Sequence, residues 1–436
     1  MEPWLAAHLP VLDLALDAVR AVQRAAARTG RRAGAADPAH LDPALLDPAR
    51  VDPARVAAGF ASDRVLALDG QPVQGFAPLS GFFATADGWV RTHANYPHHR
   101  ARLTALAGLP DDVGRPAFAE RLTELSAQDL EDRAADAGAI VARVRTEQEW
   151  RESAPGRAAV SGPLVRTRVR GPVTGTGACP PGGAPLAGVR VLDLTRVIAG
   201  PVATRTLALL GADVLRVDPP EPAEISWQHL DTGQGKRSAV LDLRDVRDRR
   251  TAQDLLDAAD VLVTGYRPGA IEAFGLRVPP GTVTGRVSAW GDAGPWSGRR
   301  GFDSIVQAAS GIALLEGRDG TPGALPAQAL DHASGYLLAA GIVDAVALRS
   351  DDGLGRDVAV SLARTAAWLL DLPGRDPVHP AAATASDSGT VTHAGVTTAR
   401  PVLPGYADYP HPAHPWGTDA PDWRPLPGQG RARLPG

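Results

Sequence analysis

Short β-branched segments alternate with helix-competent segments between residues 189 and 291, and this alternation constrains the fold more than any other feature of the chain. One helix is predicted from the Gly200-Pro201 turn to Gly211, and a second over residues 245–259. Strands joined through helices run parallel, with helices covering both faces of the sheet. The predicted strands are residues 189–195, 212–218, 238–243, 260–266 and 283–291.

This pattern predicts an α/β fold with a Rossmann-like parallel sheet, but no nucleotide-binding fingerprint accompanies it. No G-x-G-x-x-G follows the strand at 189–195. The Gly-Lys pair in residues 232–238 lacks the first glycine of a phosphate loop, and Arg237 replaces its Ser or Thr. Open parallel sheets bind ligands beyond the carboxyl ends of their strands. A ligand is therefore expected at the loops 197–201, 242–245, 264–269 and 289–295.

The chain divides into five parts. Residues 57–166 predict a smaller α+β domain, because an Asp-Gly turn joins two strand-like runs, Gly81–Thr85 and Trp89–His93, ahead of a helix from Pro97. The run 167–186 is rich in Gly and Pro and predicts a linker. The predicted parts are 1–56 (an N-terminal helix and an Asp-Pro repeat), 57–166, 167–186, 187–366 (the Rossmann-like domain) and 367–436 (a Pro-rich tail).

Three histidines, His93, His98 and His99, raise the question of a metal site. Their spacing, H-x4-H-H, has no second group of ligands nearby and no cysteine beside it. Zinc sites usually combine two such groups. The pattern favours surface or helix-capping histidines, and no metal site is predicted.

The stretch 325–347 carries the strongest candidate for chemistry. Asp331 comes directly before an apolar run in which Tyr336, Leu338 and Ile342 recur at helical spacing. Asp331 is therefore expected at the N-cap of a helix, where the helix dipole favours its ionised form. An ionised, oriented carboxylate can act as a nucleophile, although most Asp residues at helix starts only cap the helix.

Charge and cysteine content exclude several classes of protein. Lys and Arg number 45 against 49 acidic residues, a net charge of −4, so no nucleic-acid surface is expected. The single cysteine, Cys179, forms no disulfide within the chain and fits a reducing, cytoplasmic location. The N-terminus lacks the pattern of a signal peptide, and no membrane span is expected.

Six segments, in the same order, resemble family III CoA-transferases of the CaiB/BaiF type. They include PLAGVRVLDLTRVIAGPVATRTLALLGADVLRVD, ADVLVTGYRPGAIEAFGL, VSAWGDAGPWSGRRGFDSIVQAASG and ALDHASG, within residues 186–366. The resemblance implies that Asp331 is the nucleophile, that the enzyme transfers coenzyme A from an acyl-CoA to a carboxylic acid through a covalent aspartyl intermediate, and that CoA is a substrate rather than a permanent cofactor. It also implies a homodimer.

The resemblance assigns residues that contact CoA or lie beside the active centre. The first group follows the first strand, the second follows the third strand, and the arginines suit the phosphates of CoA. These residues are Ile198, Ala199, Leu241, Asp242, Leu243, Arg244, Tyr266, Arg267, Arg300 and Asp303.

The chain departs from the family in two ways, and two alternatives stay open. The small-domain-like part precedes the Rossmann-like part, so the order is permuted, and Ala273 replaces an arginine that some members carry. A non-catalytic acyl-CoA-binding protein on the same scaffold is one alternative. An acyl-CoA racemase is disfavoured, because Phe302 stands where a racemase has a histidine.

Overall fold

A computed structural model describes residues 2–32, 47, 50–173, 184–266 and 271–425. A seven-stranded sheet forms its centre, in the order β6-β12-β11-β10-β7-β8-β9. The six strands from β12 to β9 are parallel, and β6 joins the edge antiparallel to β12. The strands are β6 (Arg166–Pro172), β7 (Arg190–Leu194), β8 (Asp213–Asp218), β9 (Arg237–Val240), β10 (Val261–Thr264), β11 (Val283–Ser288) and β12 (Leu354–Ser361).

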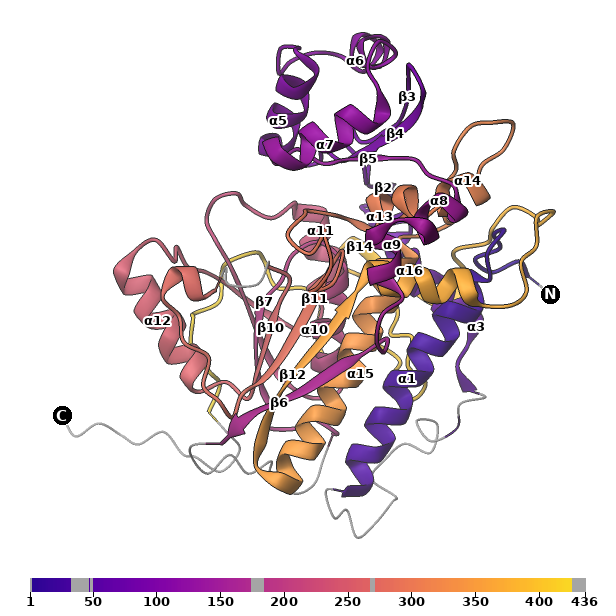
Figure 1. The fold of residues 1–436 in the computed structure, drawn as a ribbon. Helices are drawn as coiled ribbons and strands as arrows, with labels where there is room; N and C mark the ends of the chain where they lie inside the picture. The colour runs from indigo at the N-terminus through magenta and orange to yellow at the C-terminus, as the bar shows by residue number, and fades with distance from the viewer. Residues whose placement is uncertain (1, 33–46, 48–49, 174–183, 267–270, 426–436) are drawn as a thin grey trace.

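Helices cover both faces of this sheet, which confirms the predicted fold class (Figure 1). Successive residues of a strand point to opposite faces, and accordingly Val191 and Val261 join the core beneath α10 and α15, whereas Leu192 and Leu262 join the core beneath α12. The helices of this part are α1 (Val11–Arg32), α10 (Ala199–Leu209), α11 (Ser226–Thr232), α12 (Val246–Asp257), α13 (Asp303–Ala309), α14 (Ile312–Leu315), α15 (Ala329–Asp352), α16 (Leu362–Asp371) and η3 (Glu272–Phe274).

Helix α15 is the central helix of the protein. It packs against α10 on one side and against α1 on the other, and it also lies on β11 and β12. A Cβ at Gly335 would come within 2.5 Å of the Ala199 carbonyl oxygen, so the absence of a side chain there allows α10 to approach. Helix α15 is long and apolar enough to cross a membrane, but 72% of its apolar window is buried inside the fold, as in the core helix of a globular protein.

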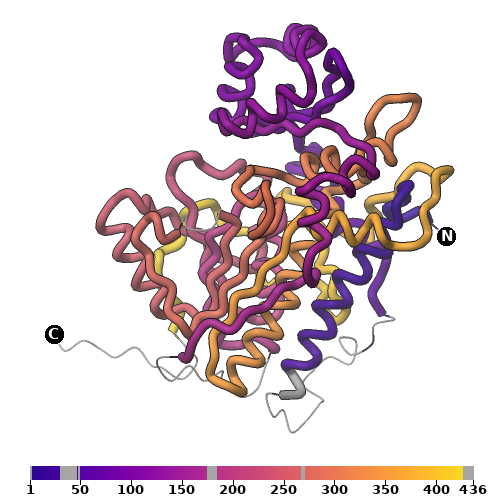
Figure 2. Tube along the Cα trace, in the orientation of Figure 1, coloured from indigo at the N-terminus to yellow at the C-terminus, as the bar shows by residue number. Residues whose placement is uncertain are grey.

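The small domain lies above the carboxyl edge of the central sheet (Figures 1 and 2). Phe83, Phe118 and Leu130 belong to a hydrophobic core of its own. The strand–turn–strand and the helix from Pro97 form as predicted. Its elements are β3 (Gly81–Thr85), β4 (Gly88–Thr92), β5 (Val141–Arg143), α5 (Pro97–Ala107), α6 (Arg115–Leu122) and α7 (Ala127–Ala137), and α8 (Glu147–Glu152) and α9 (Ala154–Ala159) follow it.

A segment from the first part of the chain pairs with a segment from its last part. Residues 67–72 and 390–399 share a small antiparallel sheet, with β1 paired to β14. The last Asp-Pro of the repeat starts a helix, since Asp52 accepts a hydrogen bond from the Ala54 N–H; most of the repeat lies outside the described residues. The remaining elements are α3 (Pro53–Phe60), α4 (Ser62–Val65), β1 (Ala67–Leu68), β2 (Gln71–Pro72), η4 (Asp387–Gly389), β13 (Thr390–His393) and β14 (Val396–Ala399).

Two of the predicted parts differ from the structure at their ends. Strand β6 occupies the start of the segment predicted as a linker, because its backbone completes the edge of the sheet beside β12. Helix α16 extends to Asp371, beyond the predicted end of the Rossmann-like domain at residue 366. Within the predicted linker, residues 174–183 lie outside the described residues.

Candidate active site

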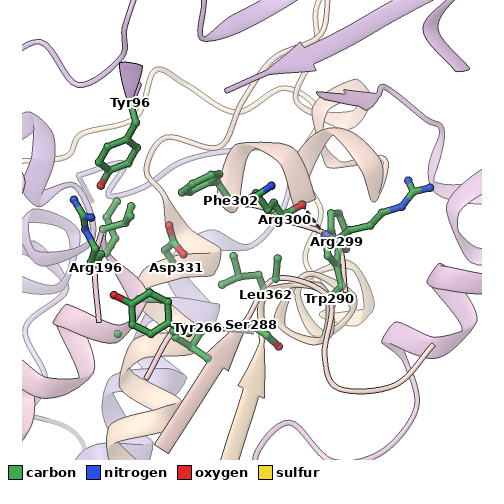
Figure 3. Close-up of a pocket in the computed structure, with 18 of the residues that line it drawn as sticks. Tyr96, Arg196, Tyr266, Ser288, Trp290, Arg299, Arg300, Phe302, Asp331 and Leu362 are labelled. Atoms are coloured by element: carbon green, nitrogen blue, oxygen red, sulfur yellow. Dashed lines mark hydrogen bonds between the residues drawn. The ribbon is translucent and has the colours of Figure 1, made fainter. Parts of the chain in front are cut away.

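A cavity of about 430 Å³ opens between the carboxyl edge of the central sheet and the small domain (Figure 3). This is where open parallel sheets bind their ligands. Its walls come from the ends of β7, β10 and β11, the start of α15, and the start of α5 in the small domain. The lining residues include Tyr96, His98, His99, Arg196, Val197, Ile198, Ala199, Tyr266, Trp290, Arg299, Arg300, Phe302, Asp331 and Leu362.

Asp331 lies at this cavity, but it does not cap the helix. The N-cap of α15 is Gln328, and Asp331 is the third helical residue. The prediction of an N-cap was therefore wrong by one turn, because the helix begins at Ala329, ahead of the aspartate. Asp331 is 7% exposed, and no described residue donates a hydrogen bond to its carboxylate. The carboxylate is buried, yet it remains open to a molecule that enters the cavity.

A second carboxylate, Asp303, holds the backbone of Asp331. Its Oδ2 accepts the Asp331 N–H at 2.9 Å, and its Oδ1 accepts a hydrogen bond from Gln307. Burial raises the pKa of Asp303 to about 6. Burial, together with the charge of Asp303, raises the pKa of Asp331 well above its usual range. Desolvation and a like charge therefore oppose the helix dipole that was expected to favour the ionised form of Asp331.

The pH dependence of turnover is expected to report this pair. A nucleophilic carboxylate must be ionised, so the raised pKa of Asp331 moves the acid limb of the kcat profile to higher pH, whereas an exposed aspartate would give a flat profile from pH 5 to 8. Asp303→Asn keeps an acceptor for the Asp331 N–H and removes the like charge, and should move the limb to lower pH. Measuring kcat from pH 5 to 9 tests this. A flat wild-type profile, or a limb that moves to higher pH in the variant, contradicts it.

The turn between β7 and α10 forms one wall of the cavity under backbone strain. Val197 has φ of +72°, a conformation that a β-branched residue rarely adopts. A Cβ at Gly200 would lie 2.4 Å from the Cβ of Thr195, so only glycine fits there. Asp193 holds the turn from below by accepting hydrogen bonds from Thr195 and from Lys236. Ile198 and Ala199, which were predicted to contact CoA, line the cavity.

A buried ionic cluster fixes Arg196 and ties the small domain to the sheet. Glu224 forms ion pairs with Arg216 at 2.6 Å and with Arg196 at 3.4 Å, and it accepts a hydrogen bond from the Tyr96 hydroxyl at 2.8 Å. The side chains of Glu224 and Arg216 are almost completely buried. Tyr96 and Arg196 both line the cavity (Figure 3). The cluster therefore connects Tyr96, on the small-domain wall of the cavity, with Arg196, on the wall formed by the sheet.

Two other predicted residues reach the cavity. Tyr266 lies at the end of β10, and Arg300 lies in the loop before α13. The guanidinium of Arg300 donates to the Gly138 carbonyl of the small domain at 3.2 Å, and its own carbonyl accepts from the Trp290 indole. Arg300 thus joins the loop to the small domain at the rim of the site.

The segment Leu241–Arg244 does not line this cavity. Leu241 and Leu243 pack in the core beneath α12, and Arg244 is exposed and paired with Asp242 at 2.9 Å. Contacts of this segment with CoA stay a prediction for a part of the ligand that extends beyond the cavity. Arg267 lies outside the described residues.

The histidines of the small domain are not surface residues. His93 and His99 are 5% and 6% exposed, and His99 lines the cavity together with His98. The surface interpretation was wrong for these two, because the small domain buries the end of β4 and the start of α5 against the loop before α13. His93 stacks on Phe302 with ring centroids 3.8 Å apart. Among the described residues, no group of three or more His, Cys, Asp or Glu side chains could hold a metal ion.

Sequence reasoning missed the residues that the small domain contributes. Tyr96 and His99 lie more than 200 residues from Asp331, and no local pattern joins them to it. Arg196 had a signal, since it directly precedes the loop 197–201, which was predicted to bind ligand. His332, next to Asp331, is completely buried against Phe60 and does not line the cavity.

A buried carboxylate at the carboxyl edge of a parallel sheet defines a ligand-binding site that contains a candidate nucleophile. Comparison with known proteins identifies the class: residues 186–390 match the model of CoA-transferase family III. The predicted resemblance to this family is therefore confirmed for that part of the chain.

Several known proteins are similar to this chain. An acetyl-coenzyme A transferase of Hypoxylon pulicicidum is 35% identical over 45% of this chain and 35% of its own length. A succinyl-CoA:glutarate CoA-transferase of Mus musculus is 33% identical over 39% of this chain and 44% of its own length. A CaiB/BaiF family crystal structure from Brucella suis is 27% identical, with a TM-score of 0.40 over 43% of this chain and 56% of that chain. The chain thus spans less than half the length of these two curated relatives.

Proposed function

We propose that this protein transfers coenzyme A from an acyl-CoA to a carboxylic acid, with Asp331 as a covalent nucleophile. The observation that carries the proposal is the placement of Asp331: a buried carboxylate, free of protein hydrogen-bond donors among the described residues, at the cavity of a domain that matches CoA-transferase family III. Covalent catalysis divides one difficult transfer into easier steps.

The proposed transfer proceeds through two mixed anhydrides and one aspartyl-CoA thioester. The Asp331 carboxylate attacks the thioester carbonyl, the carbon–sulfur bond breaks, and a mixed anhydride and CoA thiolate form. The thiolate attacks the aspartyl carbonyl, which releases the donor acid and leaves an aspartyl-CoA thioester. The acceptor carboxylate attacks this thioester to give a second anhydride, and the thiolate then takes the new acyl group and frees Asp331. Arg196, Arg299 and Arg300 around the cavity suit the negative charge of the ligand.

Relatives named for CoA transfer to glutarate and to malate show which acids such enzymes accept, and a carboxylic acid acceptor is proposed here without a choice among them. A homodimer and a cytoplasmic location, both predicted from the sequence, are part of this proposal.

The mass of the intact protein after incubation with a panel of acyl-CoAs tests the covalent step. We expect an adduct of the mass of CoA or of the acyl group on the wild type, removed by hydroxylamine, and none on Asp331→Asn. Asp344→Asn, on the same helix but paired with Arg28 at the surface, is the matched control and should form the adduct. Tight binding of CoA without any adduct would favour the alternative of a non-catalytic acyl-CoA-binding protein.

A further inference from the structure

His99 is a buried polar side chain that lines the cavity, and within the described part of the chain its ring has no hydrogen-bond partner. It is the third residue of α5 and is 6% exposed, and among the described residues none forms a hydrogen bond with either ring nitrogen. Its Nδ1 is buried without a partner. A buried polar group without a hydrogen bond is destabilising, because it has lost its contacts with water. The Nε2 atom of His99 is not enclosed in this way, and we expect a ligand in the cavity to supply its partner.

His99 and Asp331 line the same cavity. Its ring lies 5.9 Å from the ring of Phe302, centroid to centroid. Phe302 directly precedes Asp303, which accepts the Asp331 N–H at 2.9 Å. Phe302 therefore links the ring of His99 to the residue that positions the Asp331 backbone.

The imidazole of His99 is neutral. Burial, followed by the neighbouring His98 and the charges of Arg300, Arg102 and Arg196, lowers its pKa to about 3. A neutral imidazole donates one hydrogen bond and accepts another, and it offers no charge to a carboxylate. It suits a hydroxyl or an oxo group.

We propose that His99 is a specificity-determining residue: it forms a hydrogen bond with an uncharged hydroxyl or oxo group on the acyl chain of the substrate. The residue is supplied by the small domain of the same chain that carries Asp331. The proposal rests on the proposed function of the cavity as an acyl-CoA site, and it names the substrate class as hydroxyacyl- or oxoacyl-CoA.

Binding measurements in a chain that cannot react test this proposal. In the Asp331→Ala background, calorimetry would give Kd values for butyryl-CoA and for its 2-hydroxy, 3-hydroxy and 3-oxo derivatives. We expect His99→Phe to weaken binding of at least one substituted ligand about 10-fold while butyryl-CoA changes less than about 2-fold, since one neutral hydrogen bond is lost. His99→Gln, which keeps a donor and an acceptor, should restore much of the affinity.

His93→Phe is the matched control, because His93 is equally buried and lacks partners for both ring nitrogens, but does not line the cavity. It should not discriminate between the ligands. For His99→Phe, an equal loss of affinity for all four ligands would assign the hydrogen bond to the shared pantetheine arm and overturn the proposal. No loss of affinity for any ligand would also overturn it. If the background variant binds none of the CoA thioesters, the proposed function itself fails.

Discussion

Replacing Asp331 with asparagine is expected to reduce the rate of CoA transfer at least about 10³-fold while the Kd for CoA changes little. An amide of nearly the same shape fills the site, but it cannot attack a thioester or leave from an anhydride, and loss of a nucleophile has effects of this size in other covalent enzymes. Steady-state turnover with the best donor and acceptor found, together with calorimetry for CoA, measures both quantities.

The comparison separates an enzyme from a binding protein. A variant that keeps CoA affinity and loses turnover shows that Asp331 reacts, whereas equal turnover in wild type and variant would contradict the proposed role. Asp344→Asn, which removes a carboxylate from the exposed face of the same helix, is expected to leave turnover unchanged. A loss of CoA affinity in Asp331→Asn alone would indicate instead that the carboxylate helps to shape the cavity.

Removing the charge of Glu224 is expected to lower the free energy of unfolding by about 3–5 kcal/mol, which is the usual effect of breaking a buried ion pair by replacing one partner. Glu224→Gln leaves the buried Arg216 paired with Asp218, and it weakens the contact with Arg196. Urea unfolding of the two proteins at pH 7 measures the difference.

The pH dependence of stability provides a second readout for Glu224. Burial alone would raise its pKa, but Arg216 and Arg196 outweigh burial and lower the pKa to about 2. Because the folded-state pKa lies below the unfolded value of about 4.3, the contribution of Glu224 is present above that value and is lost as the pH falls toward 2. The difference between wild type and variant should therefore shrink at acid pH. Glu221→Gln, at an exposed position nearby, is the control and should change stability by less than about 0.5 kcal/mol.

The sequence by itself determined the central sheet. Alternation of Val and Leu in segments such as 190–194 and 261–264 forces one residue of each pair toward α10 and α15 and the next toward α12, so both the strands and the two helical layers follow from local pattern. The motif around Asp331 also placed the candidate nucleophile, because the residues that define it are contiguous in the chain.

Only the tertiary structure decided what surrounds that carboxylate. Strand β6 was predicted as linker, since a polar edge strand gains its structure from pairing with β12 and not from its own pattern. Burial and Asp303, 28 residues away, raise the pKa of Asp331, whereas the start of α15 alone predicted that the ionised form would be favoured. Tyr96 and His99 reach the cavity because the small domain packs over the sheet edge. Local periodicity records which face of an element is apolar, but not which distant element meets it, and it is this meeting that builds the site.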